Sequence, residues 1–223
     1  MANICSNVLY VNSNNTKALE SLNSAINMWQ KGNFCNRDKN YPWLMENIIG
    51  YSGIDTYDKE NDRFSHFSCR GEMGDSRFEN NTLIISFSTA WNPDFSVWDA
   101  IFKKYLHCEY TVSYVSDEPG CELFLSNDSD YIGKYNIDIY DDIDGIEDIE
   151  KSDDFYCASE ETVYELCRTL LAPECINLPI YKEYIKQTDT YGSIETLISR
   201  LDDFDIPVGI HKWDSEPYET FVF

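Results

Sequence analysis

The chain has 223 residues, of which 43% are hydrophobic and 15% aromatic, and it carries a formal net charge of −23. This aromatic content suffices for a sizeable core and excludes the class of disordered acidic proteins. So large an excess of carboxylates repels nucleic acids and anionic membranes, so that direct binding to either is not expected and basic partners are favoured.

The charge is unevenly distributed along the chain. Residues 1–112 hold 13 Asp/Glu and 10 Lys/Arg, a balance of −3, whereas residues 113–223 hold 27 and 7, a balance of −20. The eight cysteines show no C-x-x-C spacing. No stretch approaches the ~20 apolar residues that span a bilayer, and the start MANICSNVLYVNSNN has no signal-peptide pattern. We therefore expect a cytoplasmic protein with reduced thiols and no membrane association.

The first 80 residues predict one strand, one helix and an irregular insertion. Apolar and polar residues alternate over 4–13, which predicts a strand. Thr16 is expected to cap a helix that runs to about Lys31, because apolar residues recur on one of its faces. Residues 32–80 contain Pro42, Gly50, Gly53, Gly71 and Gly74, so we expect an insertion of turns and short strands, a kind of segment that often carries function.

The next segments predict a compact α+β layer. A strand is expected over residues 82–91 and a helix from Pro93 or Asp94 to Tyr105. Further strands are expected over residues 107–116, 121–127 and 134–141, the first two joined by a turn at Glu118-Pro119-Gly120.

The last third of the chain is expected to be mostly helical and acidic. The acidic run 141–154 has an isoleucine at every third position, which predicts a short helix or turn packed by one edge. This run forms the expected boundary between a domain of residues 1–140 and a region of residues 141–223 packed on it. Ser159 and Ser193 are expected N-caps, and a closing strand is expected over 206–213.

Three short motifs stand out in the first 120 residues: Asn3, Cys5, Ser6 and Asn7, then Thr89, Ala90, Trp91 and Pro93, then Glu118 and Gly120. Together they resemble the motifs of the YubB-type ferredoxin-like domain family of plasmids and phages. The resemblance covers roughly residues 1–140 and implies a ferredoxin-like antiparallel sheet with two packing helices, and an origin in a mobile element. It implies no activity and no catalytic residues.

Signatures of catalysis and of metal binding are missing from the sequence. No nucleophile elbow, P-loop, dinucleotide-binding glycine motif or H-E-x-x-H occurs, and the three histidines stand apart. An EF-hand register with Gly145 at its sixth position would place Tyr140 first and Lys151 twelfth, where carboxylates are required. We therefore expect no metal, no cofactor and no enzymatic activity.

The leading hypothesis is a non-enzymatic protein of a phage or plasmid that binds, and possibly inhibits, a basic nucleic-acid-binding host protein by mimicking phosphate charge. The alternative is a small-molecule-binding protein or enzyme with a cleft around Trp91, Trp98, Glu118 and the insertion 32–80. A third interpretation is that the charge serves solubility alone. The expected partner-binding residues are Asp138, Asp141, Asp142, Asp144, Glu147, Asp148, Glu150, Asp153, Asp154, Glu160 and Glu161.

Overall fold

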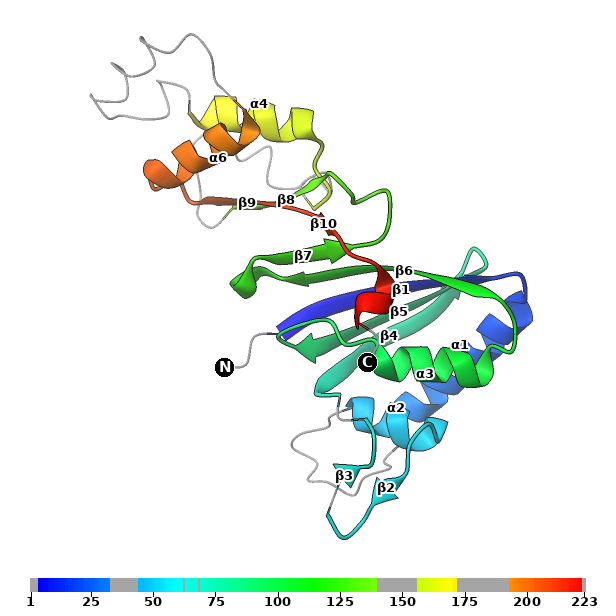
Figure 1. Cartoon of the computed structure of the whole chain (residues 1–223). Helices are drawn as coiled ribbons and strands as arrows, with labels where there is room; N and C mark the ends of the chain where they lie inside the picture. Colours follow the sequence, from blue (N-terminus) through cyan, green and yellow to red (C-terminus); the bar gives the residue numbers. More distant parts are fainter. Residues whose placement is uncertain are drawn as a thin grey trace. The chain divides into compact units, whose positions relative to one another are not determined.

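A computed structural model describes residues 4–32, 44–61, 63–67, 69–139, 156–171 and 193–221 of the α+β chain (Figure 1). The chain forms two compact units. The first comprises Met1–Asp128 with Ser215–Phe223, and the second comprises Ser129–Asp214. The boundary predicted at residues 140 and 141 lies outside the described residues.

The first unit is built on a sheet with β1 near its centre. Strand β1 pairs antiparallel with β5 on one side and with β6 on the other. Alternate residues of β1 are buried, as its alternating sequence predicts: Cys5, Asn7, Leu9 and Val11 share one face. The strand order is β10 (Asp214–Ser215), β7 (Leu123–Ser126), β6 (Tyr110–Glu118), β1 (Ile4–Ser13), β5 (Thr82–Ala90) and β4 (Gly71–Glu79).

The helices α1 (Thr16–Gln30) and α3 (Ser96–Tyr105) lie against the same face of this sheet, where they bury one continuous apolar core (Figure 1). The expected cap of α1 is corrected by one residue. Asn15 precedes the helix, and its side-chain oxygen accepts a hydrogen bond from the Ala18 N–H at 3.2 Å. Asparagine provides an oxygen that reaches the free N–H groups of the first turn, so Thr16 can be the first helical residue.

The expectation of turns and short strands over residues 32–80 holds for only part of the described segment. It contains α2 (Leu44–Ser52), a short hairpin of β2 (Tyr57–Asp58) and β3 (Arg63–Phe64), and the nine-residue strand β4. The glycines of β4 do not form turns. A Cβ atom on Gly71 would overlap the carbonyl oxygen of Ser88, so this glycine allows β4 to approach β5 closely.

The second unit has its own core and its own sheet. Strand β8 (Tyr135–Ile139) pairs antiparallel with β9 (Val208–Lys212), and the helices α4 (Glu160–Leu170) and α6 (Ile194–Asp203) pack with them. Both predicted N-caps are confirmed, because the hydroxyls of Ser159 and Ser193 accept the N–H groups of Thr162 and Thr196. In the described part of the second unit, a pair of strands therefore accompanies the two helices. The acidic run 141–154 lies outside the described residues.

None of the helices that the structure describes is both long and apolar enough to cross a membrane.

Candidate functional site

Three segments that are far apart in the sequence meet at one end of the first sheet. They are the start of β1, the end of β5 and the end of β6 (Figure 1). Cys5 pairs with Thr89, and Ser6 pairs with Asp117, so the register places Glu118 beside Cys5. These segments carry the three motifs named above. Residues of all three motifs therefore lie close together, on neighbouring strands.

A buried polar network built on Asn7 connects the three strands. The Asn7 amide nitrogen donates to the carbonyl oxygen of Cys5 at 3.0 Å and to the hydroxyl of Thr89 at 2.9 Å. Its amide oxygen accepts from the hydroxyl of Ser116 at 2.7 Å. Both amide hydrogens are used, so Asn7 has no donor left for a ligand. The network fixes the ends of the three strands relative to one another.

The network also holds the turn that follows β5. The Thr89 hydroxyl donates to the Asn92 carbonyl at 2.7 Å, and the Asn92 N–H donates to the Ala90 carbonyl at 2.9 Å. Between them, Trp91 has a φ of +73° and is 49% exposed. A left-handed backbone is unfavourable for a bulky side chain and persists only where its surroundings impose it. Ile4, which pairs with Ala90, is 62% exposed at the same end.

Glu118 is the unusual member of this region. It is an acidic residue, yet it is only 4% exposed. Burial, followed by the charges of Asp117 and Glu118, raises the pKa of the Cys5 thiol to about 12. Cys5 is therefore protonated at neutral pH and is not a nucleophile. The region thus combines an almost fully buried acidic residue, a half-exposed indole, and the Asn7 amide, whose two hydrogens are both used.

The other predicted residues that the structure describes lie on other elements. Trp98 is fully buried in α3, with its ring 5.5 Å from that of Phe87, so it belongs to the core. Of the predicted partner-binding acids, Glu160 and Glu161 are exposed in the first turn of α4 and Asp138 is half-buried on β8. No group of residues suited to hold a metal ion occurs among those described. Asp141, Asp142, Asp144, Glu147, Asp148, Glu150, Asp153 and Asp154 lie outside the described residues.

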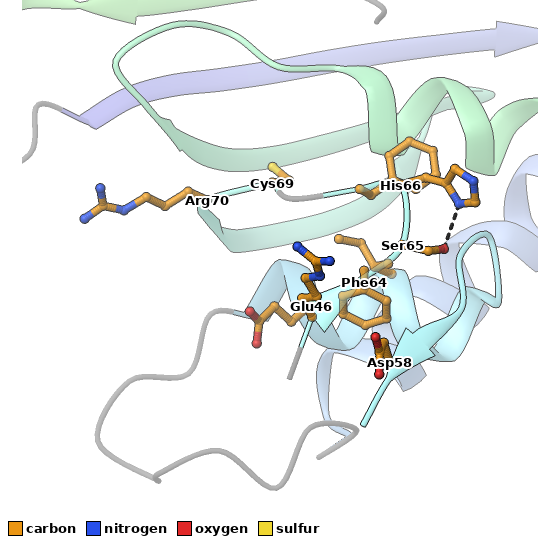
Figure 2. Close-up of a pocket in the computed structure, with 10 residues that line it drawn as sticks. Glu46, Asp58, Phe64, Ser65, His66, Cys69 and Arg70 are labelled. Atoms are coloured by element: carbon orange, nitrogen blue, oxygen red, sulfur yellow. Dashed lines mark hydrogen bonds between the residues drawn. The ribbon is translucent and has the colours of Figure 1, made fainter. Parts of the chain in front are cut away.

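A cavity of about 730 Å³ lies beside α2 and β3 (Figure 2). Its lining combines apolar side chains such as Phe64 with charged ones such as Glu46 and Asp58. Neither Trp91 nor Glu118 lines it, so the cavity is distinct from the end of the central strands.

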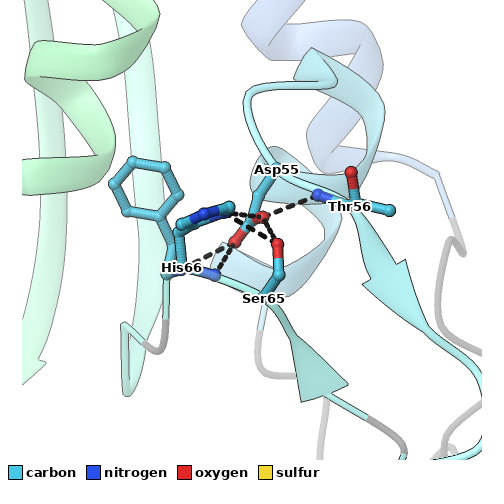
Figure 3. Close-up of polar contacts among 5 residues, drawn as sticks. Asp55, Thr56, Ser65 and His66 are labelled. Atoms are coloured by element: carbon cyan, nitrogen blue, oxygen red, sulfur yellow. Dashed lines mark hydrogen bonds and ion pairs between the residues drawn. The ribbon is translucent and has the colours of Figure 1, made fainter.

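The carboxylate of Asp55 organises the chain around this cavity (Figure 3). The side chain is fully buried and accepts hydrogen bonds from the N–H groups of Thr56 at 2.6 Å and of His66 and Phe67 at 2.7 Å, and from the Ser65 hydroxyl. Burial alone would raise the pKa of Asp55, but these hydrogen bonds outweigh it and hold the pKa well below its usual range. No motif in the sequence predicted this cluster, because the residues that donate hydrogen bonds to Asp55 lie up to twelve positions further along the chain.

Asp55, Ser65 and His66 contain the residue types of a hydrolase triad but not its geometry. The same His66 nitrogen, Nδ1, lies 2.8 Å from the Ser65 hydroxyl and 2.9 Å from Asp55, and the serine hydroxyl donates directly to Asp55. A triad requires serine and aspartate on opposite ring nitrogens, so that the histidine can take the serine proton. Asp55 therefore ties the loop together and does not activate a nucleophile.

Comparison with known proteins gives no relative from which a role could be transferred: no family model, no curated protein and no solved structure matches the chain.

Proposed function

We propose that this chain is a non-enzymatic acidic interaction protein that binds, and possibly inhibits, a basic nucleic-acid-binding protein of its host. The observation that carries the proposal is the charge of a folded unit. The second unit holds 21 Asp/Glu and 7 Lys/Arg, and it has a core and capped helices of its own. Carboxylates on a folded surface occupy fixed positions, as phosphates do on a nucleic acid.

The position of the acids on α6 favours a binding role over a purely stabilising one. Asp202 and Asp203 occupy the last turn of the helix, and Asp205 follows it; all three are exposed. The negative end of the helix dipole disfavours anions there. Glu160 and Glu161 are exposed at the opposite, favourable end of α4. Exposed acids therefore occur at helix ends where they stabilise the helix and also at ends where they do not.

The chemistry of the described clusters supports the non-enzymatic part of the proposal. Cys5 is protonated, Asn7 is saturated, and Ser65 and His66 converge on one carboxylate oxygen. None of these arrangements pairs a nucleophile with a base in reactive geometry.

We further propose that the first unit is of the ferredoxin-like type and belongs to the YubB-type family, in a phage or plasmid whose product acts in the bacterial cytoplasm. Support comes from the chain order β1–α1–β4–β5–α3–β6 combined with the antiparallel strand order β6–β1–β5–β4. The convergence of the three motifs on one end of this sheet is consistent with it.

A small-molecule site is the second candidate, and the cavity beside α2 favours it. A thermal-shift screen of metabolites tests this candidate, with Phe64→Ala as the variant that alters the cavity wall. A ligand that raises the melting temperature of the wild type but not of this variant would establish the cavity as a binding site.

The interaction proposal is tested by affinity purification from a bacterial lysate at 50 and 300 mM salt. One variant neutralises four acids of the second unit, Glu160→Gln, Glu161→Gln, Asp202→Asn and Asp203→Asn. The matched control neutralises four exposed acids of the first unit, Glu20→Gln, Glu60→Gln, Glu109→Gln and Glu219→Gln.

We expect a basic partner that is captured at low salt, released at high salt, and lost only from the second-unit variant, because screening weakens exposed charge pairs. Recovery of only neutral or acidic proteins contradicts the proposal. Equal loss of the partner from both variants shows that net charge alone matters.

A further inference from the structure

The cavity beside α2 and β3 carries charges of both signs on its wall. Arg63 and Arg70 line it, and so do Glu46 and Asp58 (Figure 2). These four charges balance, in a chain whose net charge is −23. A simple anion would be repelled by the net charge of the chain, and a simple cation would meet two guanidinium groups on the wall. A ligand that carries one charge of each sign avoids both penalties.

The hydrogen bonds of Asp58 commit this acid to its own turn. Its carboxylate accepts from the side-chain amide of Asn61 at 2.7 Å, and from the N–H groups of Glu60 at 2.9 Å and of Asn61 at 3.3 Å. The Asn61 amide, the two backbone N–H groups and the charge of Arg63 hold the pKa of Asp58 below its ordinary value. We therefore assign the positive group of a ligand to the other acid of the wall, Glu46, which is half-buried in the first turn of α2.

Another part of the wall is apolar and suits a hydrocarbon group. Ile49 is fully buried, Cys69 is 5% exposed, and Phe64 and Phe67 are half-buried. Burial, followed by the charge of Asp94, raises the pKa of the Cys69 thiol to about 12, so the thiol stays protonated and belongs to the apolar part. The cavity volume of about 730 Å³ falls within the range of small-molecule sites, ~300 to 1,000 Å³.

One side of the cavity is held in place by the chain itself. The Asp55 carboxylate accepts hydrogen bonds from the N–H groups of His66 and Phe67, at 2.7 Å each, and from the Ser65 hydroxyl. These three donor residues all line the cavity. A ligand therefore meets a wall that is already formed on this side, and it loses less free energy to ordering that wall.

We propose that the cavity binds a zwitterionic α-amino acid with an apolar side chain. Arg63 and Arg70 bind its carboxylate, because a guanidinium donates paired hydrogen bonds to a carboxylate. Glu46 binds its ammonium group, and its side chain packs against Phe64 in the apolar part of the wall. This inference rests on the second candidate function, the small-molecule site, and names its ligand class. It does not depend on the interaction of the second unit with a basic partner.

The test uses the full chain and three probes that share a phenyl ring, with affinities measured by titration calorimetry at physiological salt. Phenylalanine carries both charges, hydrocinnamate lacks the ammonium group, and phenethylamine lacks the carboxylate. Two variants each remove one charge from the wall, Arg63→Gln and Glu46→Gln. The matched controls are Arg77→Gln and Glu72→Gln, which remove the same charges from exposed positions on β4, outside the cavity wall.

We expect phenylalanine to bind about tenfold more tightly than either other probe, because each of them lacks one ion pair. Arg63→Gln should weaken phenylalanine and hydrocinnamate but not phenethylamine, Glu46→Gln should weaken phenylalanine and phenethylamine but not hydrocinnamate, and the controls should change nothing. Phenylalanine that binds no more tightly than the other two probes, or a variant that weakens all three equally, overturns the amino-acid site. Binding of one singly charged probe alone also overturns it, but leaves the cavity as a small-molecule site for another class of ligand.

Discussion

Asp55 and Asn7 are the centres of two polar clusters of the first unit, and they differ in what they connect. Asp55 accepts hydrogen bonds from three backbone N–H groups and from the Ser65 hydroxyl, all within one loop. Asn7 bonds to the hydroxyls of Thr89 and Ser116, which lie on two other strands. The first cluster holds a single loop, whereas the second joins three strands of the sheet.

This difference separates a local role from one that extends across the sheet. The donors to Asp55 lie within residues 56–67, so the loss of Asp55 should loosen that loop. The partners of Asn7 lie on β5 and β6, and Thr89 in turn holds the turn that carries Trp91, so the loss of Asn7 should loosen that end of the sheet.

The largest expected effect is that of Asp55→Ala. Removing the carboxylate takes the acceptor from three backbone N–H groups and from the Ser65 hydroxyl at once, so we expect a loss of about 3 kcal/mol, concentrated in the loop from residue 55 to 67. Denaturant unfolding measures the global loss, and hydrogen exchange measures the local one. Asp58→Ala is the control, because Asp58 caps an exposed turn. An equal effect of the two substitutions would refute the special role of Asp55.

Acid should weaken the same loop. Because the pKa of Asp55 is lowered in the folded protein, its contribution is complete above the unfolded value of about 4 and declines as the pH falls below that value. Wild-type stability should therefore fall more steeply between pH 5 and pH 2 than that of Asp55→Asn, which has no carboxylate to protonate. Parallel pH profiles would show that Asp55 is not held in its ionised form.

A smaller effect is expected from Asn7→Ala, which breaks the network that clamps the Trp91 turn. We expect a loss of about 2 kcal/mol, because the Ser116 and Thr89 hydroxyls each lose a buried partner. Asn12→Ala on the same strand is the control, since its single side-chain bond, to Thr82, is exposed. Denaturant midpoints of the two variants that coincide would contradict the clamp.

Local patterns in the sequence were enough to predict most of the elements. The alternation over residues 4–13, the apolar face of residues 16–31 and the capping serines at 159 and 193 each depend on neighbouring residues, and each is confirmed. Strand β4 escaped prediction because Gly71 and Gly74 suggested turns, whereas they permit close approach to β5. Whether such a glycine forms a turn or permits close strand packing depends on β5, which lies later in the chain.

The sites were harder to predict for the same reason. Trp91 and Glu118 were singled out together, and strand pairing brings them to one end of the sheet, but their neighbour in the prediction, Trp98, belongs to the core. The Asp55 cluster depends on a hairpin that returns Ser65 and His66 to the aspartate. No spacing rule in the sequence encodes such a return.

The most direct test of the account is the capture of a basic host protein at 50 and 300 mM salt, by the wild type and by the variant in which Glu160, Glu161, Asp202 and Asp203 are neutralised. The account predicts capture by the wild type at low salt, release at high salt, and loss of capture in the variant, because exposed carboxylates of the second unit provide the attraction. Capture that neither salt nor the four substitutions change would contradict the account.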